Sequence, residues 1–190
     1  MSVNSRLGIF GGTFDPPHLG HLAALRAVWA TGHLDRIVVT VAGDPYLKSS
    51  STTLAPAGIR LAMAHAAFDD LPGVEVSDIE VRRVGPTYTI DTVDALSTPD
   101  LSIVLIVGAD VVGQLPRWRE AERLSQLVEV LVLPRDGSAA VLPPGWRGTI
   151  VDMDPVDVSS TEVRRRLENG ENPAELVPTA VVPWLTEGDE

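Results

Sequence analysis

Residues 6–21 read RLGIFGGTFDPPHLGH, a short apolar run followed by a turn-rich segment that carries two histidines. The apolar run 6–10 predicts a β-strand. The Gly11-Gly12 pair behind it predicts a sharp turn and lets a ligand approach the backbone closely. Pro16-Pro17 fixes the path that follows and suits the entrance of a helix. The stretch therefore predicts a strand, a tight turn and a helix in succession, which is the unit of an α/β fold.

The same alternation continues along the chain, with strand-like runs rich in Val and Ile separated by helical stretches. The run IVLIV at 103–107 does not alternate between apolar and polar residues, which indicates a strand covered on both faces. The fold class is therefore α/β, with a Rossmann-like, doubly wound, mostly parallel sheet and helices on both faces. We expect one domain over residues 1–190, whose small C-terminal helical segment, about 159–190, packs against the sheet domain. The expected strands are 6–10, 36–42, 74–81, 101–107, 127–133 and 148–152, and the expected helices are 19–31, 57–69, 89–96, 117–124 and 160–168.

Three unusual segments come directly after predicted strands. They are GGTFDPPHLGH at 11–21, GDPYLKSSS at 43–51 and GADVVGQLPRW at 108–118. Ligands of doubly wound sheets bind beyond the carboxyl ends of the strands, near the point where the topology reverses. The sequence therefore places the functional site at this edge. The polar segment 43–56 is long enough to be a functional loop, and it contains Lys48, the single lysine of the sequence.

Composition excludes several classes of protein. The 190 residues include 26 acidic and 15 basic side chains, for a formal net charge of −11, and no cysteine. A non-specific nucleic-acid binder would carry a basic face, so no nucleic-acid partner is expected. No apolar stretch approaches the roughly 20 residues of a membrane span, and the N-terminus lacks the pattern of a signal peptide, so no membrane association is expected. The absence of cysteine excludes disulfides and thiolate zinc sites and fits a cytoplasmic protein.

His18 and His21 are three residues apart at the predicted start of a helix, so their side chains face the same way. A helix N-terminus offers unpaired N–H groups and the positive end of the helix dipole, and two imidazoles beside it make an anion site suited to phosphate. The alternative is that each histidine is an ordinary surface residue or a helix cap. A zinc site is disfavoured because no third ligand accompanies the pair.

A second candidate phosphate site is VSSTEVRRRL at 158–167. Ser159 and Glu162 have the spacing of a capping box, which predicts that a helix starts here. Ser160 and Thr161 add hydroxyl groups at the helix start, and Arg164 lies one turn further along the same side. Hydroxyls, free amides and a guanidinium together can hold phosphate. The alternative is a purely structural helix start.

These motifs carry a family resemblance that extends over residues 6–184. The G-x-G-x-x-G and G-K-[ST] patterns of other nucleotide-binding proteins are missing from the 11–21 segment, whereas His18-Leu19-Gly20-His21 resembles the (H/T)-x-G-H signature of the nucleotidylyltransferase superfamily. The 158–167 segment is similar to the S-S-T-x-x-R motif of the same superfamily. GPTYTIDTV at 85–93, GADVVGQLPRW and a terminal V-P-x-x-V pattern at 177–181 resemble the bacterial nicotinate mononucleotide adenylyltransferases.

The resemblance implies an enzyme that joins ATP and nicotinate mononucleotide to give nicotinate adenine dinucleotide and pyrophosphate. Mg²⁺ is implied as an ion carried with ATP, and no metal held by protein side chains is implied. The implied residues are His18, His21, Lys48 and Arg164 for catalysis; Gly11, Gly12, Thr13, Phe14, Ser159, Ser160, Thr161, Gly108 and Arg135 for ATP and its phosphates; and Thr87, Tyr88, Thr89, Asp110 and Trp118 for nicotinate mononucleotide.

Several of these implied roles have a plain physical reading and a structural alternative. Trp118 offers a flat face on which a pyridine ring can stack, but a Trp in an amphipathic stretch is commonly a core residue. The turn 87–89 can present backbone amides to a carboxylate. Asp110 can hold ribose hydroxyls or act as a helix N-cap, and Arg135 can reach a nucleotide or remain a solvated surface residue.

One position departs from the family pattern. The family usually has a His-Lys pair after the second strand, and here Leu47 stands in place of the histidine while Lys48 is kept. The lost side chain is expected to weaken triphosphate binding.

Two other functions are weighed against this one. One is a sister transferase acting on pantetheine phosphate or another acceptor, which shares the histidine pair but lacks the 85–118 section. The other is a non-catalytic nucleotide-binding module. A homo-oligomer is compatible with the sequence, in which no feature separates an interface from an ordinary surface patch.

Overall fold

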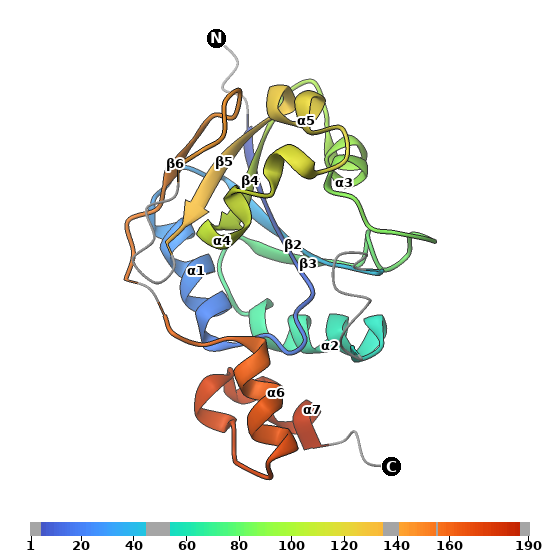
Figure 1. Ribbon diagram of the computed structural model, residues 1–190, viewed down its shortest axis with the longest axis vertical. Helices are drawn as coiled ribbons and strands as arrows, with labels where there is room; N and C mark the ends of the chain where they lie inside the picture. Colours follow the sequence, from blue (N-terminus) through green and yellow to red (C-terminus); the bar gives the residue numbers. More distant parts are fainter. Residues whose placement is uncertain (1–4, 45–53, 135–140, 155, 187–190) are drawn as a thin grey trace.

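The computed structural model describes residues 5–44, 54–134, 141–154 and 156–186. Figure 1 shows a central sheet with helices on either side of it and a group of helices from the C-terminal part of the chain at one end. The strands are β1 Ser5–Gly12, β2 Arg36–Val41, β3 Val74–Ser77, β4 Leu101–Gly108, β5 Val128–Leu133 and β6 Gly148–Ile150. The α-helices are α1 Leu19–Ala30, α2 Ala57–Phe68, α3 Thr89–Leu96, α4 Ala109–Val112, α5 Ala121–Leu127, α6 Ser160–Glu168 and α7 Val182–Thr186, with short 3₁₀ turns at Leu115–Arg117, Ala174–Leu176 and Thr179–Val181.

The sheet has the strand order β3-β2-β1-β4-β5-β6, and every neighbouring pair is parallel. The chain builds one half of the sheet outward from β1 and then crosses back, so β4 lies on the other side of β1. The crevice beyond the carboxyl ends of β1 and β4 is therefore the switch point, where doubly wound sheets bind their ligands.

Both faces of the sheet are covered, which confirms the doubly wound prediction. In β1, Phe10 belongs to the core cluster that includes α1 and α2, whereas Leu7 and Ile9 belong to the cluster that includes α3 and α5. The run 103–107 is buried throughout, and its side chains are shared between the two clusters in strict alternation. An apolar strand that does not alternate is thus explained by burial on both sides.

Two predicted elements differ from the structure. Strand β3 ends at Ser77 rather than at residue 81, because the chain turns back on itself and the amide of Arg82 donates to the carbonyl of Asp78 (2.9 Å). The helix expected at 117–124 is interrupted, because Trp118 has an extended backbone and Glu120 has a positive φ of 51°. Helix α5 therefore starts only at Ala121.

The glycine pair has a different role from the predicted turn. Gly11 and Gly12 continue β1 and pair with Thr40 and Val41 of β2, and the chain leaves the sheet only after them. A Cβ atom on Gly12 would lie 2.8 Å from the ring of Phe14, which folds back over the strand end. Gly12 is required for this close approach rather than for a turn.

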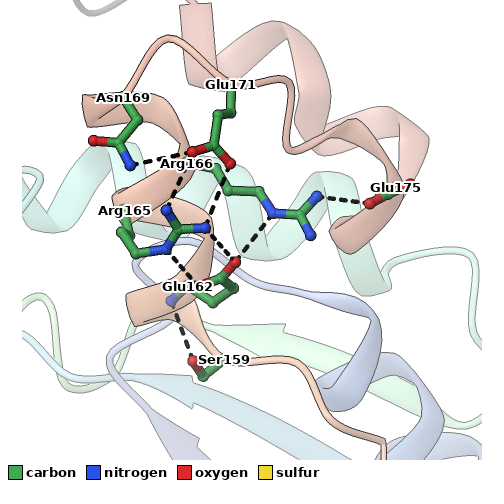
Figure 2. A network of polar contacts seen from close by, with 7 residues as sticks. All are labelled: Ser159, Glu162, Arg165, Arg166, Asn169, Glu171 and Glu175. Atoms are coloured by element: carbon green, nitrogen blue, oxygen red, sulfur yellow. Dashed lines mark hydrogen bonds and ion pairs between the residues drawn. The ribbon is translucent and has the colours of Figure 1, made fainter.

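The C-terminal segment packs on the α1–α2 side of the molecule. Val163, Val177 and Val181 are buried in the same cluster as the apolar faces of α1 and α2. Polar side chains on α6 and the following turn form an ion-pair network, in which Glu162 pairs with Arg165 (2.8 Å) and Arg166 (3.1 Å), as Figure 2 shows. None of the helices in the described residues is long and apolar enough to cross a membrane.

This network predicts a loss of stability in acid. The hydrogen bonds from Arg165 and then Arg166 lower the pKa of Glu162 from 4.5 to about 2. A carboxyl group with a lowered pKa in the folded state stabilises the protein above its unfolded pKa, and this contribution fades as the pH falls toward the folded value. We expect Glu162→Gln to lower the denaturation midpoint at pH 7, and the difference from wild type to shrink as the pH falls from 4.5 toward 2.

Denaturant titrations at several pH values measure this difference directly. Glu168→Gln is the matched control, since Glu168 is an exposed carboxylate on the same helix and forms no ion pair with another described residue. A midpoint difference for Glu162→Gln that stayed constant across the acid range would contradict the prediction.

Candidate active site

Two adjoining cavities occupy the switch point of the sheet. One, called the Trp118 cavity, has a volume of about 290 Å³ and extends from Trp118 and the 87–89 turn to the strand ends. The other, called the His18 cavity, has a volume of about 210 Å³ and extends from His18 to Ser160. The two share Phe10, Gly11, Gly12, Thr13, Gly108 and Val111 in their linings. Two ligands placed in them would therefore meet over the carboxyl ends of β1 and β4.

The two histidines form the N-terminal cap of α1. His18 is only 4% exposed, and its Nδ1 accepts a hydrogen bond from the amide of Gly20 (3.1 Å). Nδ1 of His21 accepts one from the amide of His18 (3.2 Å), and the two rings stack with centroids 3.7 Å apart. The cap considered as an alternative for these residues is thus confirmed. Because Nδ1 of each ring accepts an N–H, the neutral ring carries its hydrogen on Nε2, where it can serve a phosphate oxygen.

Phe14 packs against the histidine pair through the ring of His21. It is 2% exposed, and its ring packs edge-on against Phe10, Phe68 and His21 with centroid distances of 5.7, 5.6 and 5.0 Å. Its φ of 50° lies in the left-handed region, which turns the chain back over the end of β1. The imidazole of His21 is therefore seated on a fixed aromatic cluster.

The C-terminal motif reaches the same turn from the other side. Ser160 lines the His18 cavity and donates a hydrogen bond to the carbonyl of Pro16 (2.9 Å). Nη1 of Arg164 donates to the carbonyl of Asp15 and lies 3.9 Å from its carboxyl oxygen Oδ2. Nη2 of Arg164 lies 3.4 Å from the hydroxyl of Thr161, as the predicted one-turn spacing requires. Helix α6 thus brings one guanidinium to the turn after β1.

The predicted capping box at this helix is only half formed. Ser159 accepts a hydrogen bond from the amide of Glu162 (3.2 Å), so the predicted helix start is confirmed. The carboxylate of Glu162, however, bonds to Arg165 and Arg166 instead of turning back to the amide of Ser159. Two guanidinium partners outcompete a single backbone amide for this carboxylate.

The Trp118 cavity combines aromatic walls with one cation. Thr87, Tyr88, Thr89 and Trp118 all line it, so the structure brings these four predicted residues together. Nε1 of Trp118 is buried and has no hydrogen-bond partner among the described residues. Arg119 also lines the cavity, and its guanidinium lies 4.6 Å from the centre of the Tyr88 ring. The cavity can therefore hold a flat ring that bears negative charge.

Glu80 is a buried carboxyl group in the lining of this cavity. Its Oε1 accepts a hydrogen bond from the hydroxyl of Thr92 (2.8 Å), which in turn lies 3.3 Å from Nη1 of Arg83. Burial raises the pKa of Glu80, and the hydrogen bond from the Thr92 hydroxyl together with the charge of Arg83 only partly opposes this. The Glu80 carboxyl group thus links the 78–83 turn to Thr92 of helix α3, and this link helps to position the 87–89 turn that lines the cavity.

The remaining predicted residues are distributed as follows. Gly108 lines both cavities, and Asp110 lines the His18 cavity rather than the Trp118 cavity where a mononucleotide contact was expected. Ser159 and Thr161 stand at the start of α6, beside the His18 cavity but outside its lining. Lys48 and Arg135 lie outside the described residues.

Sequence reasoning missed Arg119, Glu80, Asp15 and Arg60. Arg119 follows Trp118 directly, so its neighbour could have pointed to it. Glu80 lies within the predicted strand 74–81, and Asp15 lies inside the turn-rich segment 11–21, so neither stands out as a site residue. Arg60 donates hydrogen bonds to the carbonyls of Thr13 and Ala42, which line the site but are distant from it in sequence, so no local pattern indicates its role.

A divalent ion would find little protein coordination here. The described part of the chain contains no group of three or more His, Asp or Glu side chains arranged to hold a metal. Apart from the single carboxylate of Asp110, the polar side chains that line the His18 cavity are imidazoles and hydroxyls, which suit phosphate oxygens better than a cation. A metal that arrives on a triphosphate fits this set, since it needs few ligands from the protein.

Comparison with known proteins identifies the family of this chain. A family profile described as cytidylyltransferase-like matches residues 9–166, so the chain is a nucleotidyltransferase of that class. Proteins from Gemmatimonas aurantiaca and Roseiflexus sp. are 37% and 40% identical over 95% and 94% of this chain, covering 89% and 94% of their own lengths. Both are named probable nicotinate-nucleotide adenylyltransferases, as is a Dehalococcoides mccartyi protein that is 40% identical over 97% of this chain and 96% of its own length. The chain belongs to the nicotinate-nucleotide adenylyltransferase family, which confirms the resemblance seen in the sequence.

Solved structures show the same fold. The nicotinic acid mononucleotide adenylyltransferase of Plasmodium falciparum, in complex with NaAD, superposes with a TM-score of 0.77 over 95% of this chain and 94% of its own, at 16% identity. A nicotinate-nucleotide adenylyltransferase structure from Vibrio parahaemolyticus gives a TM-score of 0.69 at 19% identity, over 95% and 91% of the two chains. The α/β fold predicted from the sequence is therefore confirmed.

Proposed function

We propose that this protein transfers the adenylyl group of ATP to nicotinate mononucleotide, giving nicotinate adenine dinucleotide and pyrophosphate for NAD biosynthesis. The observation that carries the proposal is the pair of cavities that meet at the switch point. One is bordered by the stacked histidines at a helix N-terminus, and the other by Trp118 and Arg119. The family to which the chain belongs carries out this reaction.

The reaction needs alignment more than chemistry from the protein. A phosphate oxygen of nicotinate mononucleotide forms a bond to the α-phosphorus of ATP, and the bond from that phosphorus to the oxygen bridging to the β-phosphate breaks. This attacking oxygen is ionised at neutral pH, so no general base is required, and the displacement proceeds in line without a covalent intermediate. The enzyme holds two anions together and stabilises the charge that develops on the leaving pyrophosphate.

The His18 cavity is the proposed place of the ATP phosphates. Nε2–H groups of His18 and His21 donate to the reacting and leaving phosphates, and the hydroxyl of Ser160 and the guanidinium of Arg164 assist from α6. Support comes from the stacked rings, whose Nδ1 atoms are engaged by backbone amides and whose Nε2 atoms therefore act as donors. Gly11, Gly12, Thr13 and Gly108 form the shared wall along which the two substrates meet. Lys48 and Arg135 remain predicted phosphate ligands from the sequence alone.

The Trp118 cavity is the proposed place of the pyridine ring and its carboxylate. Trp118 stacks on the ring, the amides at the start of α3 and the guanidinium of Arg119 face the carboxylate, and Tyr88 is held beneath that guanidinium. Asp110 lines the His18 cavity, so we keep its predicted role of holding ribose hydroxyls and place that contact in this cavity.

A divalent metal accompanies the triphosphate in this class of enzyme, and we take it to be Mg²⁺ held mainly by phosphate oxygens and water. A cytoplasmic location belongs to the same proposal and rests on the cysteine-free composition. Formation of a homo-oligomer stays a prediction from the sequence.

Pyrophosphate release tests the proposal. ATP and Mg²⁺ are supplied with nicotinate mononucleotide, nicotinamide mononucleotide or phosphopantetheine as acceptor, and a reaction without acceptor measures background hydrolysis. We expect turnover with nicotinate mononucleotide to exceed that with the other two by at least about tenfold. A site that pairs with the nicotinate carboxylate rejects the uncharged carboxamide strongly, and phosphopantetheine has no ring to stack on Trp118. Turnover with phosphopantetheine instead would overturn the assignment of the Trp118 cavity. No turnover by folded protein that still binds ATP would indicate a non-catalytic module.

A further inference from the structure

Arg60 is a buried arginine on the first turn of α2. It is 2% exposed, and its guanidinium donates hydrogen bonds to four backbone carbonyls. Nη1 donates to Thr13 (2.9 Å) and Ala42 (2.7 Å), Nη2 donates to Gly43 (3.2 Å), and Nε donates to Ala55 (2.9 Å). These four bonds, called the Arg60 clamp, join the turn after β1, the end of β2 and the residues before α2.

Packing alone does not account for a charged residue at this position. The buried side of α2 is otherwise apolar, with Met63, Ala64, Ala67 and Phe68 in the core cluster. Burial disfavours a charged group and lowers the pKa of Arg60, an effect that the nearby Asp15 carboxylate opposes. An arginine keeps its charge even so, and its planar fork can serve several acceptors at fixed angles. A methionine would fill the volume, but it would leave four carbonyls without a donor.

The clamp holds the walls of both cavities. Thr13 lines the Trp118 cavity and the His18 cavity, and Ala42 lines the Trp118 cavity. The next residues extend the connection, because the amide of Asp44 donates to the hydroxyl of Thr87 (3.2 Å) and the amide of Thr87 donates to the carbonyl of Asp44 (3.0 Å). A shift of the guanidinium would therefore move the shared wall of the two cavities relative to the Thr87 turn.

We propose that Arg60 is a positioning residue for adenylyl transfer, whose four hydrogen bonds set the spacing between the turn after β1 and the wall of the Trp118 cavity. This inference rests on the proposed function. It assigns Arg60 no contact with substrate. Its effect is on how often the two bound substrates reach the in-line geometry, so its loss lowers kcat more than it raises KM.

Two substitutions separate the hydrogen-bond geometry of the Arg60 guanidinium from its positive charge. Arg60→Lys keeps the positive charge, but its single nitrogen has three donors and cannot bond to four separate carbonyls. Arg60→Met keeps a similar volume and removes every donor. A misplacement of about 1 Å can cost about 10²-fold in rate, so we expect kcat to fall about 10²-fold in Arg60→Met and about tenfold in Arg60→Lys. KM for ATP should change by less than about threefold in both variants.

Met63→Ala is the matched control. Met63 is buried on the same helix, and its truncation leaves a cavity in the core without touching the clamp. All rates are expressed per folded molecule, with the folded fraction taken from denaturant titration at the assay temperature. Met63→Ala is expected to be less stable and to keep the kcat of wild type.

The outcomes separate the explanations. A lowered kcat in Arg60→Lys, with KM nearly unchanged and Met63→Ala unaffected, supports the proposal, and this milder variant decides the matter if Arg60→Met does not fold. A kcat restored to wild type in Arg60→Lys, or a kcat per folded molecule unchanged in both variants, overturns it, because Arg60 would then supply only charge or only stability. Wild-type protein without turnover in the same assay would contradict the proposed function, and this inference with it.

Discussion

Replacing His18 or His21 by alanine is expected to lower kcat about 10²- to 10³-fold, which corresponds to roughly 3 to 4 kcal/mol of transition-state stabilisation. The backbone holds each imidazole by Nδ1, and the stacked rings leave little rotational freedom. Donors fixed in this way need no reorganisation when charge develops on the leaving phosphates. The loss should therefore appear in kcat, because the interaction strengthens in the transition state.

The capping role of the histidines must be separated from their role toward phosphate. His18→Ala removes the acceptor for the amide of Gly20 and should cost about 0.5 to 2 kcal/mol of stability, as losses of helix caps do. His18→Asn is the matched variant, since asparagine is a favourable N-cap but has no group at the position of Nε2. We expect Asn at this position to recover most of the stability and none of the rate. An effect limited to KM, or a kcat restored by Asn, would contradict the assignment.

An acidic chain that acts on two anions depends on local rather than overall charge. The formal charge of −11 repels the substrates at long range. Close to the switch point, the positive end of the α1 dipole lies beside the His18 cavity, and the guanidinium groups of Arg164 and Arg119 stand beside the two cavities. These groups act over a few ångströms, where screening by salt is weak.

The fold was largely predictable because its signals are local. The alternation of apolar runs and helical stretches places β1, β2, β4 and β5 within one or two residues of their observed bounds. The errors fall where tertiary contacts override local preference. The 78–83 turn replaces the end of a predicted strand, because Glu80 accepts a hydrogen bond from Thr92 of α3. The helix expected at 117–124 is interrupted, because Trp118 has an extended backbone and its side chain lines a cavity.

The site was predictable only where chemistry and spacing coincide in a short segment. His18 and His21 are three residues apart, and Ser160 and Arg164 are four apart, so a helical period indicates their shared direction. Arg60 gives no such signal, because the carbonyls that it binds lie between 5 and 47 residues away and backbone atoms leave no trace in the sequence. The second role of the histidines, as acceptors at Nδ1, likewise depends on the orientation of the rings.

Truncating Phe14 to alanine is expected to cost about 3 to 5 kcal/mol of stability, which is the usual range for a buried phenylalanine. The ring is 2% exposed and fills the space between Phe10, Phe68 and His21. Alanine would also have to keep the positive φ of 50°, which suits glycine better than any side chain. Denaturant titration measures the stability, and pyrophosphate release per folded molecule measures the rate.

Phe68→Ala separates the loss of core packing from the loss of support for the histidine. Phe68 is equally buried and packs on Phe14 with centroids 5.6 Å apart, but it lies on α2, away from the start of α1. Both variants should lose similar stability, because both leave a cavity of the same size class. Only Phe14→Ala removes the ring on which His21 rests, so only that variant should lose kcat per folded molecule, by about tenfold or more. Equal kcat values in the two variants would mean that the backbone cap, the stacked ring of His18 and the ring of Phe10, 6.0 Å from that of His21, are enough to orient His21 without Phe14.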